Sequence, residues 1–134
     1  MTVLLSDQRA VQTAEDVVAV RQAVRQRAVD LGFNLVDQTK IVTASSELAR
    51  NTVQYGGGGT VTIESLEVLG RRGLRLTFAD NGPGIKDIEL AMKDGYTTAG
   101  GLGLGLSGAR RLSNDFHIDS TPGEGTRVTI TRWR

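Results

Sequence analysis

The sequence has no cysteine among its 134 residues. This absence excludes a disulfide framework and a thiolate metal site, and it is compatible with a reducing compartment such as the cytosol. Long apolar runs are also missing. No stretch approaches the ~20 apolar residues that a membrane helix needs, and the apolar run within residues 1–6 is too short for a signal peptide.

An excess of charge of either sign is missing as well. Lys and Arg number 16 against 15 Asp and Glu, and the formal net charge is +1. This balance does not call for nucleic acid or an anionic membrane surface as a partner. We therefore expect a cytoplasmic protein with no nucleic-acid or membrane partner. The length fits a single domain over residues 1–134.

Apolar spacing predicts both helices and strands. Residues 14–31 are expected to form an amphipathic helix that Thr13 can cap. A second helix is expected over residues 37–54, with Asp37 as its cap. The other expected elements are short helices at 87–92 and 106–112, strands at 2–12, 60–69, 74–79, 117–120 and 126–133, and a turn at 70–73. This layout predicts an α+β fold, a two-layer sandwich of a mixed, mostly antiparallel sheet with helices on one face.

The first chemical pattern lies on the second expected helix, which contains Glu-Leu-Ala-Arg-Asn at 47–51. Glu47 and Asn51 are four residues apart and so share one helix face. A carboxylate and an amide oxygen on one face can serve a hard cation and a nearby hydroxyl group. Taken alone, the pair is more typical of a solvated helix face.

The second pattern is Asp-Asn-Gly-Pro-Gly at 80–84, directly after an expected strand. An ionised carboxylate accepts hydrogen bonds but donates none, so Asp80 suits an exocyclic amino group such as that of adenine. Gly82 and Gly84 would let the backbone approach a ligand closely. On its own, this run is more often just a turn.

Glycine is abundant, with 17 residues, and it is concentrated in particular segments. The third pattern is Gly-Gly-Leu-Gly-Leu-Gly-Leu at 100–106, leading into an expected helix. Converging backbone N–H groups and a helix N-terminus suit phosphate. The segment lacks the Gly-Lys-Ser/Thr ending of a P-loop, and it does not follow a strand of a βαβ unit. A flexible loop without function is the plain alternative.

These patterns gain specificity from their order along the chain, which ends with Gly-Thr at 125–126 in an expected hairpin. The ordered set resembles the GHKL superfamily of ATPases and kinases. That superfamily includes type II topoisomerases, histidine kinases, mismatch-repair ATPases and the ninety-kilodalton heat-shock chaperone.

Within the superfamily, the chain resembles the RsbT-like switch serine kinases of bacteria. The segments that carry this resemblance are Leu-Gly-Phe at 31–33, Val-Asp-Gln at 36–38, Ser-Glu-Leu-Ala-Arg-Asn at 46–51, Asp-Gly-Tyr-Thr-Thr at 94–98, Gly-Gly-Leu-Gly at 100–103, Gly-Ala-Arg-Arg-Leu at 108–112 and Trp133. The similarity extends over nearly the whole chain and is weakest at its start.

The resemblance implies that ATP and Mg²⁺ bind between the second helix and the glycine-rich segment. It gives Glu47 the position of a general base toward a serine hydroxyl, and Asn51 the position of the metal ligand. Arg50 would contact phosphate or a partner, or be a plain surface arginine. The other residues that it assigns to nucleotide are Asp80 at the adenine amino group, Gly82, Gly84 and Ile85 around the base, Gly101, Gly103 and Gly105 around the phosphates, and Thr126 in support of the adenine site.

The resemblance also implies partners. The expected substrate is a serine of a small STAS-domain protein of the RsbS type, and an RsbR-type scaffold protein can also be phosphorylated. Phosphorylation would release the kinase, which then binds and activates an RsbU-type phosphatase of the PP2C class. The pathway would be a stressosome-type partner switch.

Three alternatives remain open at this stage. The first is an anti-sigma factor kinase of the SpoIIAB or RsbW type, whose nucleotide site is nearly the same. The second is a non-enzymatic module in which ATP only orders a docking face; Glu47 argues mildly against it, because binding needs no base. The third is a piece of a larger GHKL ATPase, which a chain with its own start and a strand running to the final residues makes less expected.

Overall fold

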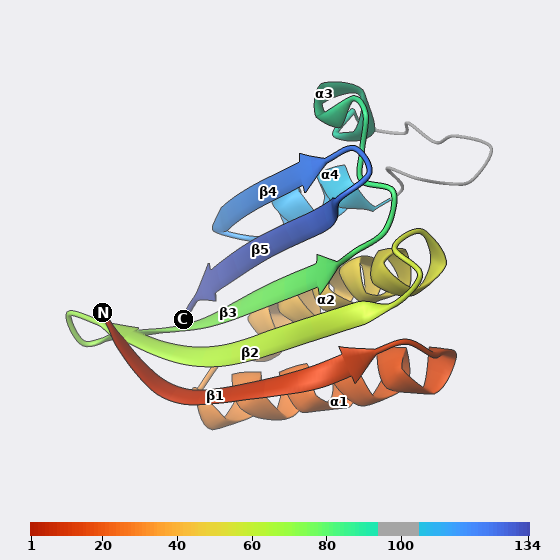
Figure 1. The fold of residues 1–134 in the computed structure, drawn as a ribbon. Helices are drawn as coiled ribbons and strands as arrows, with labels where there is room; N and C mark the ends of the chain where they lie inside the picture. Colours follow the sequence, from red (N-terminus) through yellow and green to blue (C-terminus); the bar gives the residue numbers. More distant parts are fainter. Residues whose placement is uncertain (94–104) are drawn as a thin grey trace.

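The computed structural model describes residues 1–93 and 105–134 of the chain. Five strands and four helices follow one another along them (Figure 1). In chain order these elements are β1 (Thr2–Val11), α1 (Ala14–Asp30), α2 (Leu35–Gln54), β2 (Gly59–Val68), β3 (Arg71–Asp80), α3 (Ile88–Ala91), α4 (Leu106–Arg111), β4 (Asp115–Thr121) and β5 (Gly125–Trp133). None of these helices is long and apolar enough to span a bilayer.

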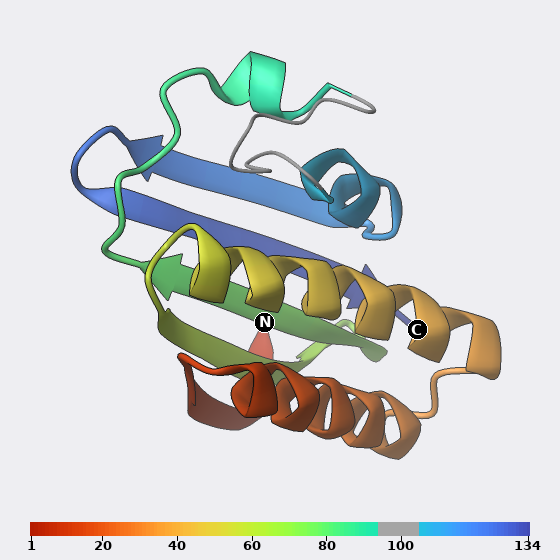
Figure 2. The ribbon, with the colours of Figure 1, turned by 90° about the vertical axis from the view of Figure 1, so that its right-hand side faces the viewer.

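The five strands form a single sheet in the order β1-β2-β3-β5-β4. All four pairings between neighbouring strands are antiparallel, which is a more uniform sheet than the mixed one expected. Helices α1, α2 and α4 lie together on one face of this sheet (Figure 2). The expected α+β fold with helices on one face is therefore confirmed.

The core lies between that face and the long helices. Strand register places Val61 opposite Phe78 and Ile63 opposite Leu76, so these side chains share the helix-facing side. All four are at most 2% exposed. Each buried side chain of this size contributes roughly 1.5–3 kcal/mol relative to an exposed one. The alternation of apolar residues along β2 and β3 thus fixes which face carries the helices.

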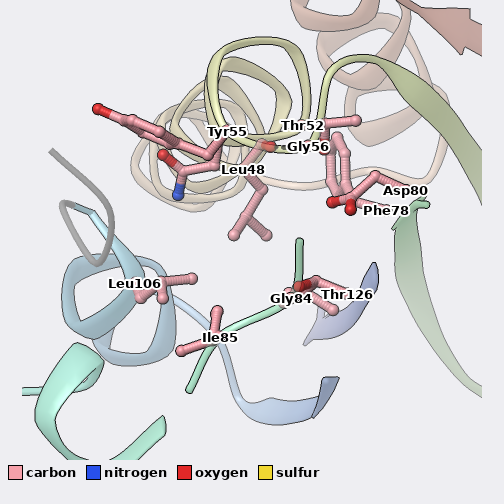
Figure 3. Close-up of a pocket in the computed structure, with 12 residues that line it drawn as sticks. Leu48, Thr52, Tyr55, Gly56, Phe78, Asp80, Gly84, Ile85, Leu106 and Thr126 are labelled. Atoms are coloured by element: carbon pink, nitrogen blue, oxygen red, sulfur yellow. Dashed lines mark hydrogen bonds between the residues drawn. The ribbon is translucent and has the colours of Figure 1, made fainter. Parts of the chain in front are cut away.

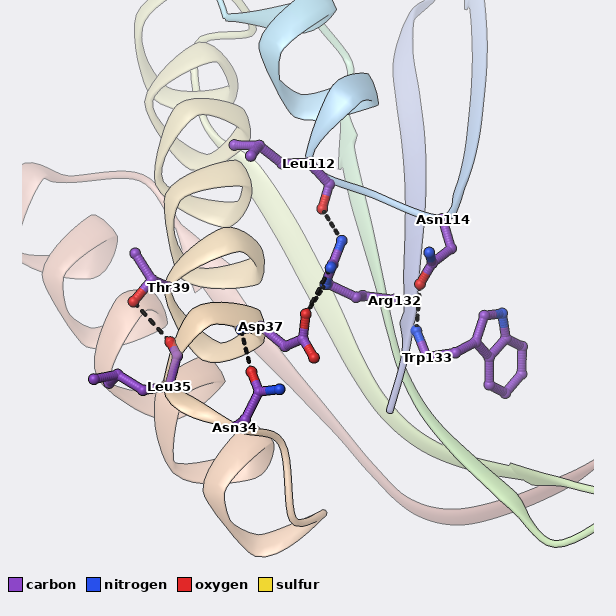
Figure 4. Close-up of polar contacts among 8 residues, drawn as sticks. All are labelled: Asn34, Leu35, Asp37, Thr39, Leu112, Asn114, Arg132 and Trp133. Atoms are coloured by element: carbon purple, nitrogen blue, oxygen red, sulfur yellow. Dashed lines mark hydrogen bonds and ion pairs between the residues drawn. The ribbon is translucent and has the colours of Figure 1, made fainter.

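The helix starts agree with the sequence at α1 and differ at α2. Thr13 caps α1 as predicted, and its side chain and that of Asp16 form a reciprocal capping box. The prediction that Asp37 caps the second helix is wrong. Asn34 is the cap, because it is the first residue after the Gly32 turn whose side chain can accept a hydrogen bond, and the Asp37 N–H donates to its Oδ1 at 2.8 Å (Figure 4).

Asp37 is thereby available for a contact between elements far apart in sequence. Arg132 of β5 donates to its Oδ1 at 2.6 Å and to the main-chain oxygen of Leu112 at 2.9 Å (Figure 4). Both side chains are largely buried, with exposed fractions of 12% for Arg132 and 22% for Asp37. This ion pair ties the start of α2 to the last strand and to the end of α4.

The β2–β3 hairpin is tighter than the turn expected at 70–73. Leu69 and Gly70 alone form the bend, with φ angles of 51° and 79°, and Val68 already pairs with Arg71. Gly73 lies inside β3 instead, because the ring of Trp133 on the adjacent strand occupies the space that a side chain would take. The glycine that looked like part of a turn therefore accommodates the tryptophan.

Candidate functional site

A pocket opens among the C-terminal half of α2, the end of β3, the start of β5 and the start of α4. Figure 3 shows Leu48 pointing from α2 toward Ile85 and Leu106 on the opposite side. The space within it is about 460 Å³, counting the open solvent at its mouth. It is lined by Leu48, Asn51, Thr52, Tyr55, Gly56, Phe78, Asp80, Gly84, Ile85, Leu106, Thr126 and Val128.

Asp80 is the last residue of β3, and its carboxylate reaches the pocket (Figure 3). The N–H of Gly82 donates to its Oδ1 at 2.9 Å, which holds the carboxylate over the turn that follows the strand. Its Oδ2 receives no hydrogen bond from the residues that the structure describes. One acceptor oxygen is therefore anchored and the other remains available to a ligand.

Glycines surround Asp80 because there is no room for side chains there. A Cβ on Gly56 would collide with the Asp80 carboxylate, and one on Gly82 would collide with the backbone of Gly56. Gly125 has a φ of 114°, and a Cβ there would run into the main-chain oxygen of Asp80. Gly84, with a φ of 74°, has the same problem with the main chain at Thr121. Of the two predicted glycines, Gly84 lines the pocket and Gly82 is not among its lining residues.

Thr126 lies directly across from Asp80 in the β3–β5 pairing, although 46 positions separate them in sequence. Its Oγ1 is 2.8 Å from the hydroxyl oxygen of Ser120 on β4. The N–H of Ile85 donates to the same Ser120 oxygen at 2.8 Å. A single serine thus connects the loop after Asp80 with Thr126.

Sequence reasoning missed Ser120 and most of the apolar lining. Ser120 is a short polar residue just before the β4–β5 hairpin, and only the register that places it opposite Thr126 reveals its position. Phe78 and Leu48 carried a weak signal. Phe78 precedes Asp80 by two residues on the same strand, and Leu48 lies near Asn51 on the same helix.

The predicted residues of α2 are close to this pocket in different ways. Asn51 lines it. Glu47, one turn earlier, lies beside Gly105, where an added Cβ would be 2.6 Å from its Oε2. Arg50 Nη1 donates to Glu47 Oε1 at 2.8 Å. Gly105 is the N-cap of α4 with a φ of 82°, and the predicted phosphate residues Gly101 and Gly103 lie outside the described residues.

The donor atoms at the site suit a cation that takes most of its ligands from water and a bound phosphate compound rather than from the protein. Within residues 1–93 and 105–134 there is no cluster of three or more His, Cys, Asp or Glu that could bind a metal alone. The amide of Asn51 is an oxygen ligand of the kind that Mg²⁺ accepts, and Mg²⁺ commonly takes its remaining ligands from water and substrate phosphates. The site therefore fits a metal that arrives with a phosphate compound.

Comparisons with known proteins agree with this geometry. Residues 36–133 match the family described as histidine kinase-, DNA gyrase B- and HSP90-like ATPase. The chain is 47% identical over 131 residues to the serine/threonine-protein kinase RsbT of Bacillus subtilis (strain 168), covering 96% of this chain and 98% of that protein. It is 30% identical over 119 residues to the anti-sigma F factor of Thermoanaerobacter sp. (strain X514), covering 84% of this chain and 82% of that protein.

A solved structure supports the fold alone. The crystal structure of the RsbU and RsbW domains of a Mycobacterium tuberculosis protein superposes with a TM-score of 0.63 at 20% identity. The match covers 96% of this chain and 33% of that one. Family match, identity over nearly the full length and pocket geometry lead to one conclusion: the chain belongs to the histidine kinase-, DNA gyrase B- and HSP90-like ATPase family, and within it to the RsbT-like serine/threonine-protein kinases.

Proposed function

We propose that residues 1–134 form one ATP-binding serine kinase domain of a bacterial stress-response partner switch, acting in the cytoplasm. The observation that carries the proposal is the pocket in which the carboxylate of Asp80 lies across from Thr126, with Asn51 on the adjoining helix. An ATPase family match and the likeness to RsbT support the use of ATP.

The adenine ring would occupy the Asp80 end of this pocket. The available Oδ2 of Asp80 accepts a hydrogen bond from the exocyclic amino group, which only an acceptor can do. Ile85 and Phe78 offer apolar surface, with exposed fractions of 6% and 2%, against which the base would pack. Thr126, whose hydroxyl is held by Ser120, supplies a further polar contact. Gly84, which lines the pocket, lets the chain pass close to the main chain at Thr121 on that side.

The phosphates would extend toward α2 and the glycine-rich segment that includes Gly101 and Gly103. Asn51 would hold Mg²⁺ through its amide oxygen. When bound, that ion neutralises negative charge on the phosphate oxygens. Gly105, at the start of α4, would complete the phosphate end.

Glu47 would act as the general base toward a serine hydroxyl of the substrate. Its carboxylate takes the hydroxyl proton while the serine oxygen forms a bond to the γ-phosphorus of ATP. The bond from that phosphorus to the bridging oxygen breaks, and ADP leaves with the electron pair. Positioning of the two reactants supplies most of the rate in such transfers.

The proposed substrates are STAS-domain proteins of the RsbS and RsbR types, by similarity to RsbT. A phosphate adds about −1.5 to −2 of charge to the docking surface. The added charge would weaken docking and release the kinase. The released kinase would then bind and activate a PP2C-type phosphatase of the RsbU type.

Incubation with labelled ATP, Mg²⁺ and an RsbS-type STAS protein tests the proposal. We expect label on a serine of the STAS protein with the wild-type chain and almost none with Glu47→Ala, although both bind ATP in a calorimetric titration. Absence of label with a folded pair that binds ATP would refute the kinase reaction proposed here. If ATP binding is equally strong and no transfer occurs in either variant, the chain is a nucleotide-gated binding module.

An anti-sigma factor kinase is the second candidate, since the chain is 30% identical to an anti-sigma F factor. A pull-down with the purified chain separates the two. Capture of a sigma factor in the presence of ATP supports the second candidate, whereas capture of STAS proteins and an RsbU-type phosphatase supports the first.

A further inference from the structure

The two oxygens of the Glu47 carboxylate have different surroundings. Its Oε1 accepts a hydrogen bond from Arg50 Nη1 at 2.8 Å. Its Oε2 faces Gly105, since a Cβ added to that glycine would be 2.6 Å from this oxygen. Arg50 is on the same helix, three residues further on. The side chain that is proposed to take the proton therefore has one oxygen engaged and one directed at the start of α4.

This ion pair contributes little to the stability of the fold. The Arg50 side chain is 44% exposed and that of Glu47 is 32% exposed, and exposed pairs of this kind contribute roughly 0–1 kcal/mol. Arg50 is also absent from the lining of the nucleotide pocket, which includes the next residue, Asn51. The pair instead fixes the orientation of the Glu47 carboxylate, because a planar guanidinium donates its hydrogen bonds along fixed lines.

We propose that Arg50 is a positioning residue for phosphoryl transfer, which it promotes by holding Oε1 of Glu47 so that Oε2 is the oxygen that receives the serine proton. The inference rests on the proposed role of Glu47. Gly105 belongs to the same arrangement, because the missing side chain leaves the space into which Oε2 projects. The start of α4 and the proposed proton acceptor therefore lie next to each other.

A double-mutant cycle tests this role. The variants are Arg50→Ala, Arg50→Lys, Glu47→Gln and the double variant Glu47→Gln with Arg50→Ala. Arg72→Ala is the matched control, since Arg72 is 47% exposed and lies 3.8 Å from Glu67, on a hairpin remote from the pocket. The measurements are kcat and KM for transfer from ATP to an RsbS-type STAS protein, and the Kd of ATP by calorimetry.

If Arg50 acts through Glu47, replacing Arg50 should lower kcat only while residue 47 can still accept the serine proton. We expect Arg50→Ala to lower kcat by roughly 10- to 100-fold, as misplacement of a catalytic group does. The Kd of ATP should stay within about twofold, Arg50→Lys should recover part of the loss, and Arg50→Ala should change kcat by less than about twofold in the Glu47→Gln background. The control should match the wild type.

Other outcomes would overturn the inference in distinct ways. An equal loss of kcat in both backgrounds would show that Arg50 contacts the phosphates itself. A raised KM for the STAS protein with unchanged kcat would show that it docks the partner. An unaltered Arg50→Ala variant would make the ion pair incidental. If Glu47→Gln transfers phosphate as fast as the wild type, the proposed role of Glu47 fails, and the inference fails with it.

Discussion

The candidate site has two ends, the pocket around Asp80 and the Glu47–Arg50 pair beside that pocket, and they are built in different ways. At the Asp80 end, main-chain register and hydrogen bonds set the geometry: Asp80 pairs with Thr126 across two strands, and Gly82 and Ser120 hold the flanking groups. At the Glu47 end, an exposed ion pair and the six-residue helix α4 set it. The first end is part of the sheet, and the second depends on side chains of two helices.

The glycines at the two ends show the same contrast. An added Cβ at Gly125 would meet main-chain atoms of Asp80 and Asn81, which cannot move without disturbing the sheet. An added Cβ at Gly105 would meet mainly the carboxylate end of Glu47, which has rotatable bonds. If ATP binds as proposed, the Asp80 end is preformed for the base, whereas the groups at the Glu47 end adjust when the substrates bind.

The largest effect should come from Glu47→Gln at the adjustable end. Glutamine keeps the shape and can still accept from Arg50, but its neutral amide is a far weaker base. We expect the rate of phosphoryl transfer to fall by roughly 10²- to 10⁴-fold, with ATP affinity and unfolding temperature unchanged. Single-turnover kinetics with labelled ATP measure the transfer rate, and calorimetry measures the ATP affinity and the unfolding temperature. A large loss of ATP affinity would mean that the two ends are not separate.

Gly125→Ala tests the rigid end and should mainly affect stability. Strain at a φ of 114° and the collision with Asp80 should together cost about 2–4 kcal/mol. Gly123→Ala is the matched control, because it has a φ of 82° in the same hairpin but nothing within 4 Å of the new Cβ. It should cost only about 1 kcal/mol. Urea unfolding gives both values, and equal losses would contradict the packing argument.

Asp80→Asn should weaken ATP binding without disturbing the turn. The amide oxygen can still accept from Gly82, but the amide nitrogen would then replace the acceptor facing the base. A mismatch of about 1–3 kcal/mol corresponds to a loss of roughly 5- to 150-fold in affinity. Affinity for GTP, whose base carries a carbonyl at that position, should fall less. Competition titrations measure the affinities for the two nucleotides. An unchanged ATP affinity would show that Asp80 does not contact the base.

Ser120→Ala should have the smallest effect of the series. It leaves the N–H of Ile85 without its acceptor and Thr126 without its partner, which should cost about 1 kcal/mol and reduce ATP affinity several-fold. Ser113→Ala is the control, since the Ser113 hydroxyl donates to Ala109 within the α4 region, away from the pocket lining. A similar affinity loss in the control would show that Ser120 acts only through general stability.

Much of the candidate site was predictable because its polar residues occur in short, ordered motifs. Asn51, Asp80, Gly84, Ile85 and Thr126 were all expected at a nucleotide, and all five line one pocket. The rest of the apolar wall, which includes Leu48, Phe78 and Leu106, was not predicted. A leucine or phenylalanine on a regular element looks the same in sequence whether it faces the core or a cavity.

Sequence alone determined the family, most of the helices and strands, and several of the polar groups that line the pocket, because these depend on local spacing and local chemistry. Tertiary structure decided which of those groups meet one another. Register placed Thr126 across from Asp80 and Ser120 across from Thr126. Asp37, expected as a helix cap, instead forms an ion pair with Arg132, 95 residues away, because contacts over such separations arise only when the sheet and helices pack together.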